Sequence, residues 1–139
     1  MHLYRNGIIE IVDALLLSHM LPNTNQRFIP AVEFERYAII GTARGLRLLR
    51  RIGASGPVAI AITLTSVKNM ILGINDWRFY TEQSPVLNEH LFLPEAIVNE
   101  LEVPFLPVIK PIIDLVWNAC GVGQSIHFDA AGNWTQAER

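Results

Sequence analysis

The sequence predicts an α+β domain in which a mostly antiparallel sheet of about four to five strands is packed by two main helices. Residues 32–52 and 106–120 each place apolar side chains at steps of three and four, which is the helical period. Short β-branched apolar runs lie before and between them, bounded by Gly, Pro and Asn. The 139 residues suit a single domain, 1–139, and with half of them hydrophobic and 17% charged they can form a core.

The N-terminal residues predict a β-hairpin. Asn6–Gly7 stands between His2–Arg5 and Ile8–Asp13, and Asn-Gly favours a type I′ turn because both residues tolerate a positive φ. We expect Ile8–Val12 as its second strand, with residues 14–17 as a candidate extension. Proline and asparagine then predict a loop up to Pro30.

The longest helix is predicted at Val32–Ile52. Pro30 stands near its first turn and Gly53 is a natural residue for its C-terminal end. Its apolar stripe, which we expect to anchor the sheet, contains Phe34, Tyr37, Ala38, Gly41, Gly45, Leu48 and Ile52. Gly41 and Gly45 lack side chains on this stripe, which predicts close approach of another backbone.

The middle of the chain predicts strands. The apolar runs at 58–64 and 69–74 flank a turn and predict a second hairpin. Residues 77–80 are a candidate edge strand and Leu91–Leu93 a short strand. Pro94–Glu100 is expected to form a helical turn.

The second helix, residues 106–120, begins near Pro107 and ends at Gly121. Trp117 and Cys120 lie on its apolar face and are expected in the core. Its opposite stripe, expected to be exposed, contains Lys110, Asp114 and Asn118. In the following tail, residues 131–133 predict a turn from which Trp134 folds back.

The most distinctive charged feature is a set of four basic residues in the long helix: Arg44, Arg47, Arg50 and Arg51. We take these residues as a candidate interaction surface. A solvated helix face and a phosphate-binding surface are the competing interpretations. The net charge of −2 and the pI of about 6.0 argue against a dedicated nucleic-acid-binding protein.

Catalytic, cofactor-binding and metal-binding motifs are not apparent. The glycines at 53–56 and 121–123 lack the context of a phosphate-binding loop, and the four histidines lack metal-ligand spacing. Glu89–His90 and His127–Asp129 are the candidate acid–base pairs for a small enzyme. A single cysteine indicates no disulfide framework, so we expect a cytoplasmic protein, without a membrane span.

Several stretches together resemble a known family. They are Tyr4–Glu10 with Val12–Asp13, Ile29–Pro30 with the helix that ends at Arg51–Gly53, and Leu93–Glu95 followed by Pro111–Gly121 and Asp129–Trp134. In this order they are similar to the C-terminal region of bacterial Schlafen/AlbA-like putative ATP-binding or DNA-binding regulators. The resemblance implies an accessory domain of a larger protein. The N-terminal domain of that family is not present, so no catalytic or nucleotide-binding residue is carried over.

These observations favour a non-catalytic interaction or oligomerisation domain of a regulatory protein. The expected partners are a second copy of the chain or an AlbA-like N-terminal domain. The alternative is an accessory nucleic-acid contact through the basic face of helix 32–52, and a small enzyme is a third, less favoured, interpretation.

Overall fold

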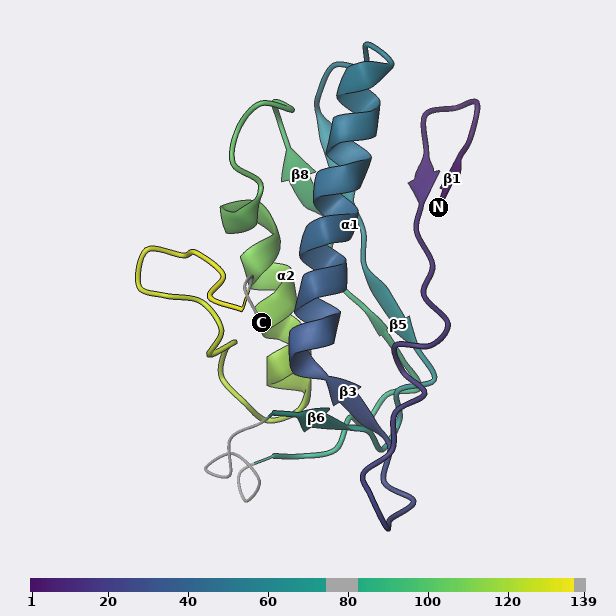
Figure 1. Ribbon diagram of the computed structural model, residues 1–139, viewed down its shortest axis with the longest axis vertical. Coiled ribbons are helices and arrows are strands. Elements are labelled where there is room, and N and C mark those ends of the chain that lie inside the picture. The colour runs from purple at the N-terminus through teal and green to yellow at the C-terminus, as the bar shows by residue number, and fades with distance from the viewer. Residues whose placement is uncertain (75–82, 137–139) are drawn as a thin grey trace.

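The computed structural model describes residues 1–74 and 83–136 and has an α+β fold, as the sequence predicts (Figure 1). Two long helices, α1 (Ala31–Arg51) and α2 (Leu106–Ala119), pack against each other in front of short strand pairs. The helix bounds lie within one residue of the predicted ones, because the helical period and the flanking Pro and Gly residues are local signals. Gly53 ends α1 with a φ of +76°.

The strands form four separate two-stranded ladders in the described residues. Three are antiparallel: β1 (His2–Leu3) with β2 (Ile9–Glu10), β4 (Val58–Ile60) with β8 (Ala96–Val98), and β5 (Thr63–Thr65) with β7 (His90–Phe92). The fourth, β3 (Phe28–Pro30) with β6 (Ile71–Gly73), is parallel. Most pairs therefore join residues far apart in the chain.

The predicted hairpin between 58–64 and 69–74 is wrong. Residues 58–64 are divided into β4 and β5, which pair with β8 and β7, and β6 pairs with β3 instead. The expected helical turn at 94–100 is also wrong, because β8 forms there. The candidate edge strand at 77–80 lies outside the described residues.

The N-terminal hairpin, residues 1–13, is confirmed as a hairpin but has a different turn. The Tyr4 backbone N–H donates to the Ile8 carbonyl at 2.8 Å. Within the hairpin, Gly7 is the one residue with a positive φ, of +86°. This is a three-residue loop, not the two-residue type I′ turn. Residues 14–17 do not extend the strand. They form a turn in which Asp13 Oδ1 accepts the backbone N–H groups of Leu15 and Leu16, at 2.8 and 2.7 Å.

The main core lies between the two helices and strands β3, β5, β6 and β7. Its largest fully buried side chain is that of Trp117, and Cys120 is also fully buried, both as predicted. A smaller cluster of Leu46, Leu49 and Leu101 lies near the end of α1. Ile9 of the N-terminal hairpin packs against this second cluster.

The buried face of α1 differs from the predicted stripe. Its buried residues are Ala31, Phe34, Glu35, Leu46 and Leu49. Of the predicted stripe only Phe34 is fully buried, and Tyr37 and Ile52 are each 53% exposed. Gly41 faces the Ile11 side chain and Gly45 faces open space, so no backbone makes the predicted close approach. The helix is therefore rotated about its axis relative to the predicted orientation, and Gly41 of the predicted stripe faces the N-terminal hairpin.

We predict opposite effects for Ala at two glycines. A Cβ at Gly56 would lie 2.0 Å from the Asn99 carbonyl oxygen in the backbone that follows β8. Gly56→Ala should therefore destabilise the fold by about 1–3 kcal/mol or more. Gly45→Ala meets no atom within 4 Å and removes a helix-interior glycine, so it should stabilise by about 0.5–1 kcal/mol. Urea unfolding followed by circular dichroism measures both, and equal effects of the two substitutions would contradict the structure.

Candidate functional site

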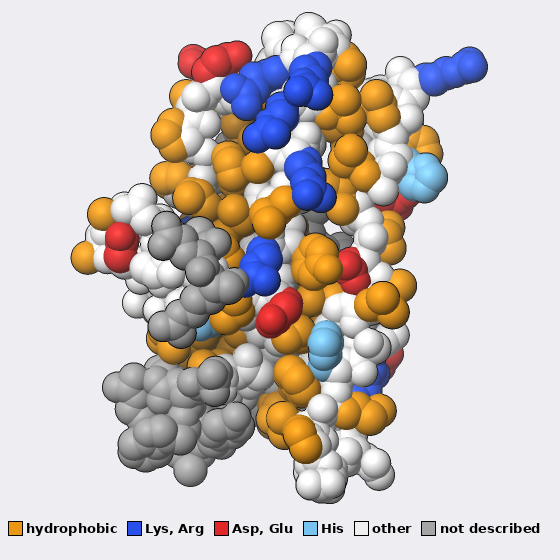
Figure 2. Space-filling view, viewed as in Figure 1, with side chains coloured by type: hydrophobic (Ala, Val, Ile, Leu, Met, Phe, Trp, Pro, Cys, Tyr) orange, Lys and Arg blue, Asp and Glu red, His pale blue; other side chains and the backbone are white. Residues whose placement is uncertain are grey.

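The four arginines of the candidate interaction surface are all exposed on the last two turns of α1. Arg44, Arg47 and Arg51 are spaced by three and four residues and so share one helix face. No ion pair or side-chain hydrogen bond within the described residues engages any of the four. Figure 2 shows basic side chains gathered along α1, beside hydrophobic side chains of the N-terminal hairpin.

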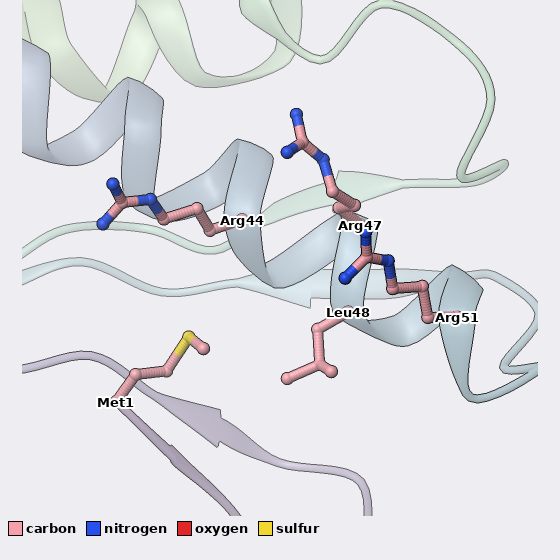
Figure 3. Close-up of a pocket in the computed structure, with 5 residues that line it drawn as sticks. All are labelled: Met1, Arg44, Arg47, Leu48 and Arg51. Atoms are coloured by element: carbon pink, nitrogen blue, oxygen red, sulfur yellow. The ribbon is translucent and has the colours of Figure 1, made fainter.

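A groove of about 230 Å³ separates this end of α1 from the hairpin. Its lining is Met1, Arg44, Arg47, Leu48 and Arg51. In Figure 3, Leu48 points from α1 toward the hairpin and Met1 lies across the gap, whereas Arg47 points away from the hairpin and Arg44 and Arg51 extend along α1. The groove thus has an apolar floor and a basic rim on the helix side.

The N-terminal segment exposes many apolar side chains for a short length of chain. Each of the following is at least 45% exposed: Met1, Leu3, Tyr4, Ile8, Ile11, Val12, Leu15 and Met20. Tyr37 and Ile40 add exposed apolar surface on the outer side of α1. We call these residues, together with the four arginines, the hairpin–α1 surface. It combines apolar area with uncompensated positive charge.

A second notable feature is the buried carboxylate of Glu35, which has no exposed surface. Four side chains bond to it. Oε1 accepts the Trp117 indole N–H at 3.0 Å and the Ser125 hydroxyl at 2.5 Å. Oε2 lies 2.8 Å from His127 Nδ1 and accepts the Trp134 indole N–H at 2.7 Å. We call these five residues the Glu35 cluster.

The Glu35 cluster attaches the C-terminal segment, residues 121–136, to α1. Ser125, His127 and Trp134 lie about ninety positions after Glu35 in the chain, so each bond closes a long loop. His127 also packs edge-on against the Trp117 ring, with 5.3 Å between ring centroids. An indole can only donate, so both tryptophans require an acceptor when buried. One carboxylate supplies it for both.

The cluster contains Ser, His and Glu but does not have the geometry of a nucleophilic triad. In such a triad the histidine accepts the serine proton and the carboxylate orients the histidine. Here Ser125 and His127 both bond directly to Glu35, and Ser125 Oγ accepts the His127 backbone N–H at 3.1 Å. The chemistry it supports is anchoring by a buried acceptor.

Three further residues of helix α2 contact the same segment. Asp114 accepts the Ser125 backbone N–H at 2.9 Å and pairs with Lys110 at 2.6 Å. Asn118 donates to the Gly123 carbonyl at 2.6 Å. Lys110 also lies 5.4 Å from the centre of the Phe128 ring. The stripe predicted to be exposed is in fact half-covered at Lys110 and Asp114 and binds the C-terminal segment.

Neither candidate acid–base pair is joined by a hydrogen bond in the residues that the structure describes. His127 bonds to Glu35, whereas Asp129 accepts the backbone N–H groups of Asn133 and Ala131 in an exposed turn. The bonds from Asn133 lower the pKa of Asp129. His90 is exposed, and its Nδ1 lies 3.4 Å from the Ser66 backbone nitrogen. No hydrogen bond within the described residues joins it to Glu89.

The sequence contained a signal for the Glu35 cluster that the predicted stripe did not use. One helix face is predicted by steps of three, four and eight residues between Ala31, Glu35, Ala38, Leu46 and Leu49. An acid within an otherwise apolar stripe indicates a buried carboxylate, which requires donors. Tryptophans outside any basic run are suitable donors. Which donors reach it depends on the long-range fold.

The described residues show neither a metal site nor a membrane helix. No three or more His, Cys, Asp and Glu side chains in residues 1–74 and 83–136 are grouped so that they could hold a metal ion. None of the helices in the same ranges is long and apolar enough to cross a membrane.

Comparison with known proteins gave no match, whether against family models, curated proteins or solved structures. The Schlafen/AlbA-like resemblance therefore stays a prediction.

Loss of the Glu35 carboxylate should release the C-terminal segment. Glu35→Gln replaces one acceptor oxygen with a donor that faces existing donors, so it should cost about 3 kcal/mol or more of folding stability. Faster amide hydrogen exchange at residues 125–135 is the specific measurement. Glu33→Gln, an exposed change on the same helix, is the matched control and should shift stability by less than about 0.5 kcal/mol. Equal exchange in the two variants would show that Glu35 does not hold the segment.

Cys120 should be unreactive in the folded protein. Burial raises the pKa of its thiol to about 12, so the nucleophilic thiolate is scarce at pH 8. We expect thiol reagents to label it only in denaturant. Rapid labelling of the native protein would show that the core around α2 opens readily.

Proposed function

We propose that this chain is a non-catalytic interaction domain that binds a partner polypeptide through the hairpin–α1 surface. The observation that carries the proposal is the exposure of the N-terminal segment, where eight large apolar side chains are at least 45% exposed. Large exposed apolar area is a feature of interaction sites on soluble proteins.

The form of the hairpin supports a polypeptide as partner. Within the described residues, strands β1 and β2 pair only with each other, so each has an outer edge that no other strand covers. Another extended chain can add to such an edge by main-chain hydrogen bonds. The hairpin is held against the fold through Ile9, which packs on the smaller core cluster, and through Ile11, whose side chain faces Gly41.

The predicted family and cellular location are consistent with an interaction domain, and both stay predictions. The Schlafen/AlbA-like resemblance favours an accessory domain, for which an AlbA-like N-terminal domain is a candidate partner. An unpaired, buried Cys120 suits a reducing compartment, and we place the protein in the cytoplasm on that ground.

The proposal can be tested with a library of random displayed peptides selected on the immobilised chain. We expect selected peptides to slow hydrogen exchange in residues 2–13 and 37–51. Their affinity should fall about tenfold or more for the double variant Ile8→Ser/Val12→Ser, because exposed apolar contacts at an interface centre supply much of the binding energy.

The matched control is Phe92→Ser, which removes an apolar side chain that is 76% exposed on β7. Since Phe92 lies outside the hairpin–α1 surface, its loss should leave peptide affinity unchanged. The proposal fails if no peptide is enriched, if protection maps elsewhere, or if the control variant weakens binding as much as the double variant. Thermal unfolding of each variant establishes that it is folded.

A further inference from the structure

We infer that the segment bound at the hairpin–α1 surface is acidic as well as apolar, with its carboxylates over the arginine rim of the groove. This inference rests on the proposed interaction function and adds the chemistry of the partner. The basis is the position of Arg44, Arg47 and Arg51, which line the groove between α1 and the hairpin.

The first step concerns the cost of covering these charges. Within the described residues, none of the four arginines has a carboxylate partner, and all are exposed to water. A partner that covers the apolar hairpin must also cover the groove beside it. Removing water from a guanidinium without a counter-charge is costly, whereas a carboxylate forms charge-assisted, often bidentate, hydrogen bonds with it. An acidic segment is therefore favoured over a neutral or basic one.

The apolar part of the inference comes from the groove floor. Leu48 and Met1 lie on opposite sides of the gap, and both offer apolar surface. A volume of about 230 Å³ accommodates a few side chains but not a folded element. A short stretch that carries an apolar side chain between acidic ones fits both the floor and the rim.

A second copy of the chain is a poorer occupant. In a two-fold symmetric contact the same patch meets itself, so the arginines of one copy approach those of the other. Antiparallel packing of α1 against its copy would bring Glu33 near the arginine end. This supplies one carboxylate for the four guanidinium groups of each copy. The two acids of the hairpin are already engaged, Glu10 by the Tyr4 hydroxyl and Asp13 by backbone N–H groups.

A nucleic acid is also a poorer occupant. The chain has a net charge of −2, which opposes association with a polyanion. Met1 and Leu48 line the groove together with three of the arginines, and their apolar surface would gain nothing from phosphate groups. An acidic, apolar polypeptide uses both halves of the surface.

The test uses the peptides selected on the chain and measures their composition and their affinity by fluorescence anisotropy. We expect enrichment of Asp and Glu next to Leu, Ile or Phe, and weaker binding at higher salt. Arg47→Glu should weaken binding about tenfold, because a charge reversal removes an attraction and adds a repulsion. Lys68→Glu makes the same charge change at an exposed turn outside the surface and should have no effect.

The outcomes separate this inference from the proposed function. Peptides that protect the hairpin–α1 surface but lack acidic residues, or bind Arg47→Glu as well as the parent chain, overturn the inference and leave the interaction function standing. Absence of selected peptides removes both. A dimer by light scattering that Arg47→Glu dissociates, or duplex DNA binding that the same change abolishes while peptide affinity is unchanged, also overturns the inference in favour of those occupants.

Discussion

The hydrogen bonds to the Glu35 carboxylate are the interaction that holds α2 and the C-terminal segment against α1. A buried acid without a Lys or Arg partner is tolerated only where donors surround it, and Glu35 is bonded by two indoles, a hydroxyl and an imidazole. Trp117 comes from α2, and the other three donors come from the C-terminal segment. The same acceptor therefore fixes α2 against α1 and the C-terminal segment against both. Because each donor would remain unpaired without it, the contribution of Glu35 is cooperative and not the sum of four separate bonds.

The burial of Glu35 also determines which side of α1 faces the solvent. With Glu35 directed into the core, the helical period turns Arg44, Arg47 and Arg51 to the opposite side, next to the N-terminal hairpin. The hairpin does not complete the packing there: Gly45 faces open space, and Tyr37 is half exposed. The buried and exposed faces of one helix are thus used differently. The carboxylate on the inner face forms internal hydrogen bonds. On the outer face, four guanidinium groups have no ion-pair or hydrogen-bond partner among the described residues.

The sequence predicts this structure well where the signals are local. The periods and flanking Pro and Gly residues give both helices to within a residue, and Asn6–Gly7 marks a real hairpin. It predicts poorly where the partner is distant. Residues 58–60 are strand-like by composition, but nothing in their own sequence indicates that they pair with 96–98. The arginine surface is found because exposed charges follow from one helix alone. The Glu35 cluster is missed because its donors lie more than eighty residues away.

A solvated helix face and a partner-binding surface are the competing interpretations of this run of arginines, and its surroundings are the ground for proposing the second. Solvated faces are usually bordered by further polar side chains, often of opposite charge. Exposed apolar side chains occur nearby, with Ile40 and Tyr37 on the same helix and Ile11 of the hairpin against Gly41. Apolar area favours loss of water, whereas unpaired guanidinium groups oppose it. A ligand that brings its own negative charge would satisfy both tendencies at once, and this is the physical basis of the acidic partner proposed above.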